Sequence, residues 1–233
     1  MYKGKTFLGV IPARGGSKGI PRKNIINVCG KPLIQYTIEE ALKSNFLDKV
    51  IVSTEDEEIA KISRECGAEV PFLRPKELAE DTTKTIEVLI HAVNEMKKQG
   101  YTYDYVVLLQ PTQPLRRYWH IDEAIAMIVD RNEESLVSVS EVREHPLLMR
   151  KIDENGKVIN LFGDNSDLRR QEFPKIYKVN GAIYINKINE NFNAKVSPND
   201  NKLAYIMDRK YDIDIDEPID VEIFKLMLER IIN

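Results

Sequence analysis

The chain has 233 residues, of which 42% are hydrophobic and 30% charged, and its formal net charge is −3. This length supports one well-packed core, and the small net charge argues against general binding to nucleic acid or anionic membranes. No apolar run approaches the ~18 residues of a membrane span, and the N-terminus lacks the pattern of a secretory signal. With two isolated cysteines, these features predict a soluble cytoplasmic protein.

An apolar segment at Phe7–Pro12 predicts a buried strand that runs directly into a basic, glycine-rich loop. The amides of Gly15 and Gly16 can turn toward an anion, because glycine adopts backbone angles closed to other residues. The loop also carries the cations Arg14, Lys18, Arg22 and Lys23. A strand followed by such a loop indicates a phosphate site, and a solvated basic turn is the alternative. The spacing fits neither a Walker loop nor a GxGxxG dinucleotide fingerprint.

Strand-like and helical patterns then alternate as far as residue 131. Strands are expected at 49–53 and 104–110, and helices at 32–44, 56–66, 84–98 and 121–131. Alternation of this kind predicts an α/β fold with a Rossmann-like, mostly parallel sheet flanked by helices. Ligands of such sheets bind at the carboxyl ends of the strands, so the loops after Pro12, Ser53 and Gln110 should converge on one crevice.

From residue 141 to residue 178 charges crowd the sequence and the alternation with helices stops. Residues 153–156, DENG, predict a hairpin turn between strands at 147–152 and 157–162. The segment is too long for an ordinary connection, and by itself its sequence fits a floppy insertion. Strands at 182–185 and 203–207 and a helix at 217–231 return the chain to the core. The expected division is a core of residues 1–140 and 179–233 with an inserted segment at 141–178.

An alternating acidic segment, DIDIDE at residues 212–217, precedes the last helix. Residues two apart in an extended segment point to the same side, so Asp214 and Asp216 can face one ion. Their hard carboxylate oxygens suit Mg²⁺, which takes a few protein ligands and fills the rest with water and phosphate. The alternative is that these acids only cap the helix and keep it soluble.

A rigid loop, QPTQPLR at residues 110–116, follows the central strand. Its two prolines restrict the backbone, and the amide of Gln110 can both donate and accept hydrogen bonds. The pattern by itself fits a proline-rich turn as well as a polar contact to a ligand.

These motifs together resemble one known family. Residues 11–24, IPARGGSKGIPRKN, are similar to the CTP-binding signature of the CMP-sialic acid synthetases, also called acylneuraminate cytidylyltransferases. Residues 110–116 resemble that family's QPTSPLR, with Gln113 in place of the usual serine. Residues 53–56 resemble a loop that commonly reads STDD, so Glu55 is one methylene longer; a helix-capping role for Ser53 or Thr54 explains that segment equally well. The resemblance is strong at both ends of the chain and loose across 141–178.

The resemblance implies an enzyme, a nucleotidyltransferase that couples CTP to a nine-carbon α-keto acid sugar and releases pyrophosphate, with Mg²⁺ as cofactor. Catalysis would rest on Arg14, Lys23, Asp214 and Asp216, and the two aspartates would hold the metal. The implied nucleotide-binding residues are Ala13, Arg14, Gly15, Gly16, Ser17, Lys23, Asn24, Arg74 and Thr82. The implied sugar-binding residues are Gln110, Arg116, Arg170, Asn180 and Tyr184.

The resemblance also implies a homodimer that pairs through the arm at 141–178, with Arg170 reaching the sugar carboxylate of the neighbouring subunit. Two other functions stay open. The CMP-Kdo synthetases share the architecture but lack the GGSKGIPRKN run, and a non-catalytic nucleotide-sugar binding protein would not need both Asp214 and Asp216. The sequence does not distinguish N-acetylneuraminic, legionaminic and pseudaminic acids as substrates.

Overall fold

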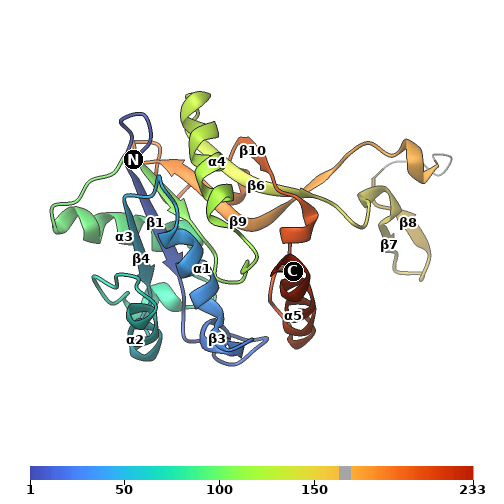
Figure 1. Ribbon diagram of the computed structural model, residues 1–233. Helices are drawn as coiled ribbons and strands as arrows, with labels where there is room; N and C mark the ends of the chain where they lie inside the picture. Colours follow the sequence, from blue (N-terminus) through green and yellow to red (C-terminus); the bar gives the residue numbers. More distant parts are fainter. Residues whose placement is uncertain (163–168, 233) are drawn as a thin grey trace.

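The computed structural model describes residues 1–162 and 169–232. A six-stranded sheet forms its centre in the order β10-β6-β9-β5-β1-β4 (Figure 1). Its strands are β1 (Phe7–Pro12), β4 (Lys49–Ser53), β5 (Tyr105–Leu108), β6 (Ser135–Glu141), β9 (Tyr177–Lys187) and β10 (Leu203–Ile206). Within the sheet β9 is antiparallel to β5 and β6, whereas the other pairings are parallel. The expected α/β fold with a mostly parallel sheet is confirmed.

Helices cover both faces of this sheet. The helices on these faces are α1 (Leu33–Leu42), α2 (Glu57–Glu65), α3 (Thr85–Lys98) and α4 (Tyr118–Asp130), and a further helix, α5 (Pro218–Ile232), packs in a separate apolar cluster. Residues of α1, α2 and α4 pack on one face with Phe7 and Ile11 of β1, and residues of α3 pack on the other face with Leu8 and Val10. Alternate residues of a strand point to opposite faces, so β1 needs apolar side chains in both directions. Among the described residues, no helix combines the length and apolar character needed to cross a membrane.

The sequence patterns do not predict β6, because serines interrupt its apolar run. Ser138 and Ser140 are both 0% exposed. Ser138 Oγ donates to Oδ1 of Asn180 at 2.6 Å and accepts from the Ile183 amide at 2.8 Å, and Asn180 Nδ2 donates to Ser140 Oγ at 2.8 Å. Buried hydroxyls are tolerated when they are hydrogen-bonded in this way, and the partners come from β9, a strand far along the chain.

The segment between β6 and β9 projects away from the sheet (Figure 1). At its base Glu141 pairs with Tyr177, and the Val142 amide donates to the Ile176 carbonyl at 3.0 Å. Two short antiparallel strands, β7 (Arg150–Ile152) and β8 (Val158–Asn160), form the predicted hairpin, although both are shorter than expected. A second small hairpin, β2 (Asn27–Val28) with β3 (Lys31–Pro32), follows the basic loop.

A third apolar cluster joins the three segments that carry the sequence motifs. Ile20 of the basic loop, Leu115 of the loop after β5, and Ile213 and Ile215 of the acidic segment pack together with Phe224 of α5. Ile215 and Phe224 are 0% exposed. Because burial of this cluster is favourable, it brings segments from the beginning, middle and end of the chain together near the carboxyl ends of β1 and β5.

Candidate active site

A cleft of about 620 Å³ opens at the carboxyl ends of β1 and β5. The basic loop, the segment from 74 to 88, the loop after β5 and the acidic segment supply its walls. The predicted site residues that line it are Arg14, Ser17, Lys23, Asn24, Arg74, Gln110 and Asp216. The loops after β1 and β5 therefore converge as expected, whereas the loop after β4 lies behind the basic loop and is absent from the lining.

Gly15 and Gly19 of the basic loop lie so close to neighbouring segments that there is no room for a side chain. Unusual backbone angles do not explain these two glycines. The expectation of special angles at Gly15 and Gly16 is wrong, because the positive φ in this loop, 56°, belongs to Arg22. A Cβ on Gly15 would lie 2.6 Å from Oδ2 of Asp56, and a Cβ on Gly19 would lie 2.2 Å from the carbonyl oxygen of Asp216. A side chain at either position would push the loop away from the neighbouring segments.

Three of the four loop cations face the cleft. Arg14 and Lys18 both pair with Asp81, each at 2.7 Å, and these partners lower the pKa of the Asp81 carboxyl, Lys18 most strongly. Lys23, whose side chain is only 14% exposed, donates to Oδ1 of Asp216 at 2.9 Å. The carboxylate of Asp81 therefore marks a position at which Arg14 and Lys18 can bind one anion together. In the described part of the chain, the amides at positions 16–18 carry no hydrogen bond that would compete for such a ligand.

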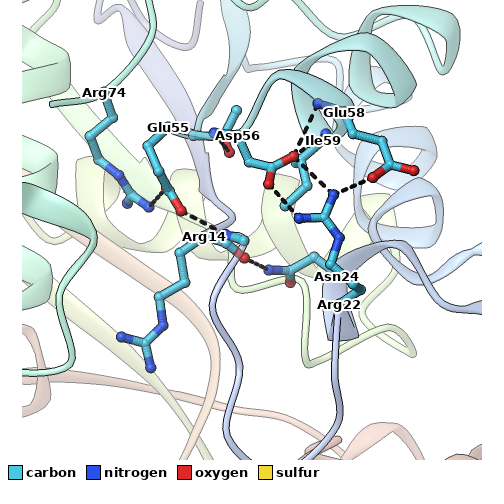
Figure 2. Close-up of polar contacts among 10 residues, drawn as sticks. Arg14, Arg22, Asn24, Glu55, Asp56, Glu58, Ile59 and Arg74 are labelled. Atoms are coloured by element: carbon cyan, nitrogen blue, oxygen red, sulfur yellow. Dashed lines mark hydrogen bonds and ion pairs between the residues drawn. The ribbon is translucent and has the colours of Figure 1, made fainter. Parts of the chain in front are cut away.

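The fourth cation, Arg22, does not line the cleft; it points toward Asp56 and Glu58 and anchors the loop (Figure 2). It pairs with Asp56 and Glu58 at the start of α2, and the hydrogen bond to Asp56 raises the pKa of Arg22. Asp56 Oδ1 also accepts from the amides of Glu58 and Ile59, both at 3.0 Å. The N-cap of α2 is therefore Asp56, and the alternative capping role for Ser53 or Thr54 is wrong.

The acidic segment has the predicted alternation. Ile213 and Ile215 are buried, whereas Asp214 and Asp216 are exposed. The Ile215 amide donates to the Thr112 carbonyl at 2.9 Å, which fixes this segment against the loop after β5. Although solvent reaches Asp214, the surrounding protein removes enough water to raise its pKa, and the charge of Asp216 acts in the same direction. The two carboxylates are close enough to repel each other. A cation bound between them would reduce this repulsion.

Of the predicted sugar-binding residues whose side chains the structure describes, Gln110 is the one that lines the cleft. Gly181, at φ 78°, lies beneath it, and a Cβ at Gly181 would meet Oε1 of Gln110 at 2.6 Å. Asn180 is 3% exposed and bonded to the serines of β6, and Tyr184 is 4% exposed and donates to Oδ1 of Asn199 at 3.0 Å. Burial raises the pKa of Tyr184 to about 12. The structure therefore places Asn180 and Tyr184 in the interior, outside the cleft.

Arg116 lies beneath the cleft, with 1% of its surface exposed. Its Nη1 donates to the carbonyls of Gln110 at 3.2 Å and Ala182 at 2.7 Å, and burial lowers its pKa to about 9. Arg116 thereby ties the loop after β5 to β9 and supports Gln110 from behind.

The remaining predicted site residues, which are Ala13, Asn24, Thr82 and Arg170, do not share one location. Ala13 is 1% exposed, and its amide donates to the Ser53 carbonyl at 3.0 Å. Asn24 Nδ2 donates to the Arg14 carbonyl at 2.9 Å and so shapes the loop from inside (Figure 2). Thr82 is exposed and does not line the cleft, which takes Thr83 and Thr85 instead. The side chain of Arg170 lies outside the described part of the structure.

The residues that the sequence patterns miss are acids and a threonine: Asp81 beside the cations, Glu55 behind the loop, and Thr112 beside Asp214. Glu55 and Asp81 each sit in a short segment that resembles the family but has no periodicity of its own. The segments alone give no indication of which partner each carboxylate meets.

Residues 8–232 match the family described as Cytidylyltransferase. The chain belongs to the cytidylyltransferase family. This cytidylyltransferase is 38% identical over 228 residues to CMP-N,N'-diacetyllegionaminic acid synthase of Legionella pneumophila, covering 96% of each chain. It is 35% identical over 225 residues to pseudaminic acid cytidylyltransferase of Campylobacter jejuni, covering 94% of this chain and 95% of that one.

A third relative of this cytidylyltransferase is longer. The chain is 35% identical over 209 residues to N-acylneuraminate cytidylyltransferase of Streptococcus agalactiae, covering 89% of this chain and 49% of the relative. The chain therefore spans about half the length of that protein. The family resemblance seen in the motifs is confirmed.

Solved structures share the fold of this cytidylyltransferase at low sequence identity. CMP:2-keto-3-deoxy-manno-octonic acid synthetase complexed with CTP superimposes with a TM-score of 0.72 at 18% identity, covering 97% of this chain and 99% of that one. The 4-diphosphocytidyl-2C-methyl-D-erythritol synthase of Anaerococcus prevotii gives a TM-score of 0.64 at 15% identity, covering 98% and 100%. These likenesses establish a shared architecture.

Proposed function

We propose that this protein couples CTP to a nine-carbon α-keto acid sugar and gives the CMP-sugar and pyrophosphate. The observation that carries the proposal is the contact between the basic loop and the acidic segment inside one cleft, where Lys23 pairs with Asp216 at 2.9 Å. Nucleotidyl transfer needs cations for a triphosphate directly beside carboxylates for a metal. The names of the relatives, which are CMP-sugar synthases and cytidylyltransferases for acidic sugars, support this class of substrate.

The basic loop would bind the triphosphate and stabilise the charge that develops on it. Arg14 and Lys23 would contact phosphate oxygens, with the amides at 16–18 as further donors. The anomeric hydroxyl of the sugar would attack the α-phosphorus, forming the new oxygen–phosphorus bond as the bond to pyrophosphate breaks, and its proton would be released to water. Holding these atoms in line and neutralising the leaving group are the main requirements of this reaction. Gln110, supported by Arg116, would present its amide to the sugar.

The carboxylates of Asp214 and Asp216 fit a magnesium ion. Both are exposed residues of the acidic segment, and Asp216 lines the cleft whereas Asp214 does not. Burial, followed by the charge of Asp216, raises the pKa of Asp214. Among the described residues, no group of three or more histidine, cysteine or acidic side chains is arranged to hold a metal by itself. Mg²⁺ takes few protein ligands and completes its shell with water and substrate phosphate; when bound, it would polarise the phosphate oxygens.

The first test is pyrophosphate release from CTP with a panel of sugar acids in the presence of Mg²⁺. We expect turnover with at least one of N-acetylneuraminic, legionaminic and pseudaminic acids, because the cleft has space and polar groups for both substrates. Activity confined to the eight-carbon 2-keto-3-deoxy-manno-octonic acid would contradict the nine-carbon assignment. Binding of CTP without turnover of any acid would indicate a non-catalytic nucleotide-binding protein.

We also propose that the chain is a homodimer that pairs through the arm at 141–178. Large apolar side chains of the arm are exposed, including Ile152 at 76% and Val158 at 67%, with Leu148, Met149 and Ile159 beside them in sequence. Such a patch is unfavourable in water, and two-fold pairing is the commonest way to cover it. We expect a dimer mass by light scattering and a monomer after Ile152→Asp combined with Val158→Asp. A monomeric wild-type protein at working concentration would contradict the proposal.

A cytoplasmic location is proposed as well. Both cysteines are free thiols, Cys29 exposed and Cys66 partly buried, as is usual in reducing compartments. Recovery of the protein in the soluble cytoplasmic fraction of its own cells would support this, and recovery in an extracellular fraction would contradict it.

A further inference from the structure

Glu55 occupies the turn between β4 and α2, behind the basic loop. Its Oε1 accepts a hydrogen bond from the Gly15 amide at 2.7 Å, and its Oε2 accepts from Nη2 of Arg74 at 2.8 Å (Figure 2). The side chain of Glu55 is 14% exposed and that of Arg74 is 3% exposed. One carboxylate therefore joins two walls of the cleft, the basic loop and the segment that carries Arg74.

The backbone of the same turn is bonded to both walls. The Ala13 amide donates to the Ser53 carbonyl at 3.0 Å, and the Arg74 amide donates to the Thr54 carbonyl at 2.8 Å. These backbone bonds bring the segments together. They do not fix the guanidinium of Arg74 or the turn of the loop at Gly15, which side chains must orient. Nε of Arg74 is buried without a partner among the described residues, so the bond to Glu55 is the contact that orients this guanidinium.

We propose that Glu55 is a positioning residue for the nucleotide: its carboxylate fixes the phosphate loop at Gly15 and the guanidinium of Arg74 at one separation. This inference rests on the proposed function, in which CTP fills the cleft that both walls line. Hydrogen bonds to a carboxylate are stronger than neutral ones, and the one to Arg74 also balances a buried charge. A cleft held in this geometry before binding loses less entropy when the nucleotide enters.

The length of the side chain is part of the inference. Glu55→Asp shortens the reach by one methylene, so the carboxylate cannot meet Gly15 and Arg74 together. Glu55→Gln keeps the length but turns one acceptor into an NH₂ group, which then faces a donor. Either change breaks one of the two contacts while leaving the surrounding core untouched.

The experiment measures CTP binding by calorimetry, without sugar, for the full chain and its variants. We expect Glu55→Gln and Glu55→Asp each to weaken CTP binding about tenfold, the loss typical of one charge-assisted hydrogen bond. Glu57→Gln is the matched control, because Glu57 is an exposed residue two positions further along and makes the same chemical change. It should bind CTP as the wild type does.

A double-mutant cycle separates positioning from a general loss of structure. If Glu55 acts by orienting Arg74, Glu55→Gln should weaken CTP binding much less in a chain that already carries Arg74→Ala. In turnover, KM for CTP should rise while KM for the sugar acid stays near the wild-type value, and melting temperatures verify that each variant is folded.

The outcomes keep the two proposals apart. A wild-type chain that does not bind CTP would overturn the proposed function and this inference with it. A wild-type chain that binds CTP, with folded Glu55 variants that bind it equally well, would overturn only the role of Glu55. Strictly additive losses from Glu55→Gln and Arg74→Ala would likewise exclude positioning of Arg74 through Glu55.

Discussion

Replacing Asp214 or Asp216 by asparagine should reduce turnover by several orders of magnitude. Asparagine keeps the shape but removes the negative charge that holds a divalent cation against the phosphates. Excess Mg²⁺ should restore part of the activity, since the expected defect is in metal affinity. The measurement is the rate of pyrophosphate release as a function of Mg²⁺ concentration, with CTP and the sugar acid saturating.

The same variants should remain folded, which separates a catalytic defect from unfolding. Burial and the charge of Asp216 raise the pKa of Asp214, so the folded state disfavours its ionised form at neutral pH. A neutral Asp214→Asn side chain removes this unfavourable charge, and we expect a melting temperature equal to or above that of the wild type. Asp130→Asn is a matched control, because it also removes an aspartate paired with a lysine, Lys3 at 2.7 Å, but on the helix α4 away from the cleft. Full activity of both Asp214 and Asp216 variants at low Mg²⁺ would contradict the metal assignment.

Lys23→Ala should lower kcat/KM for CTP by roughly tenfold to a hundredfold, and Arg14→Ala should mainly raise the CTP requirement. Lys23 is largely buried and holds Asp216, so its loss removes a cation from the phosphates and leaves the acidic segment without its partner. Arg14 is paired with Asp81 in the free protein. A triphosphate would have to break this ion pair before it could bind Arg14, so the net gain in binding free energy from Arg14 is smaller. Steady-state kinetics with varied CTP measure both effects.

Lys18→Ala is the internal comparison for these two variants. The side chain of Lys18 is 79% exposed and shares Asp81 with Arg14, so water screens its charge and we expect a smaller effect. Unchanged kinetics for both Lys23→Ala and Arg14→Ala would contradict a phosphate-binding role and would show that the basic loop is a solvated turn.

Much of the fold follows from local patterns. The unbroken apolar run of β1 and the alternation of strands and helices predict a sandwiched parallel sheet, and the ends of most elements differ from the prediction by a few residues. The patterns miss β6, because its buried Ser138 and Ser140 are satisfied by Asn180 and Ile183 of β9, and such partners are invisible to a window of neighbouring residues.

For the site, the sequence by itself determines which groups are present and, where a repeat exists, which way they face. The alternation of Ile213 and Ile215 with Asp214 and Asp216 already places both carboxylates on one side, because the geometry of an extended backbone fixes the directions of neighbouring side chains. The strand that leads into the glycine-rich loop likewise indicates a phosphate site from local order alone.

Only the tertiary structure decides which partner each charged group meets. Arg22 looks like a phosphate ligand in the sequence, yet it pairs with Asp56, and Arg116 is buried against Ala182. The Gly15 amide meets Glu55 across 40 positions of the chain. Local periodicity cannot specify such contacts, because they depend on how the burial of three apolar clusters sets distant segments side by side.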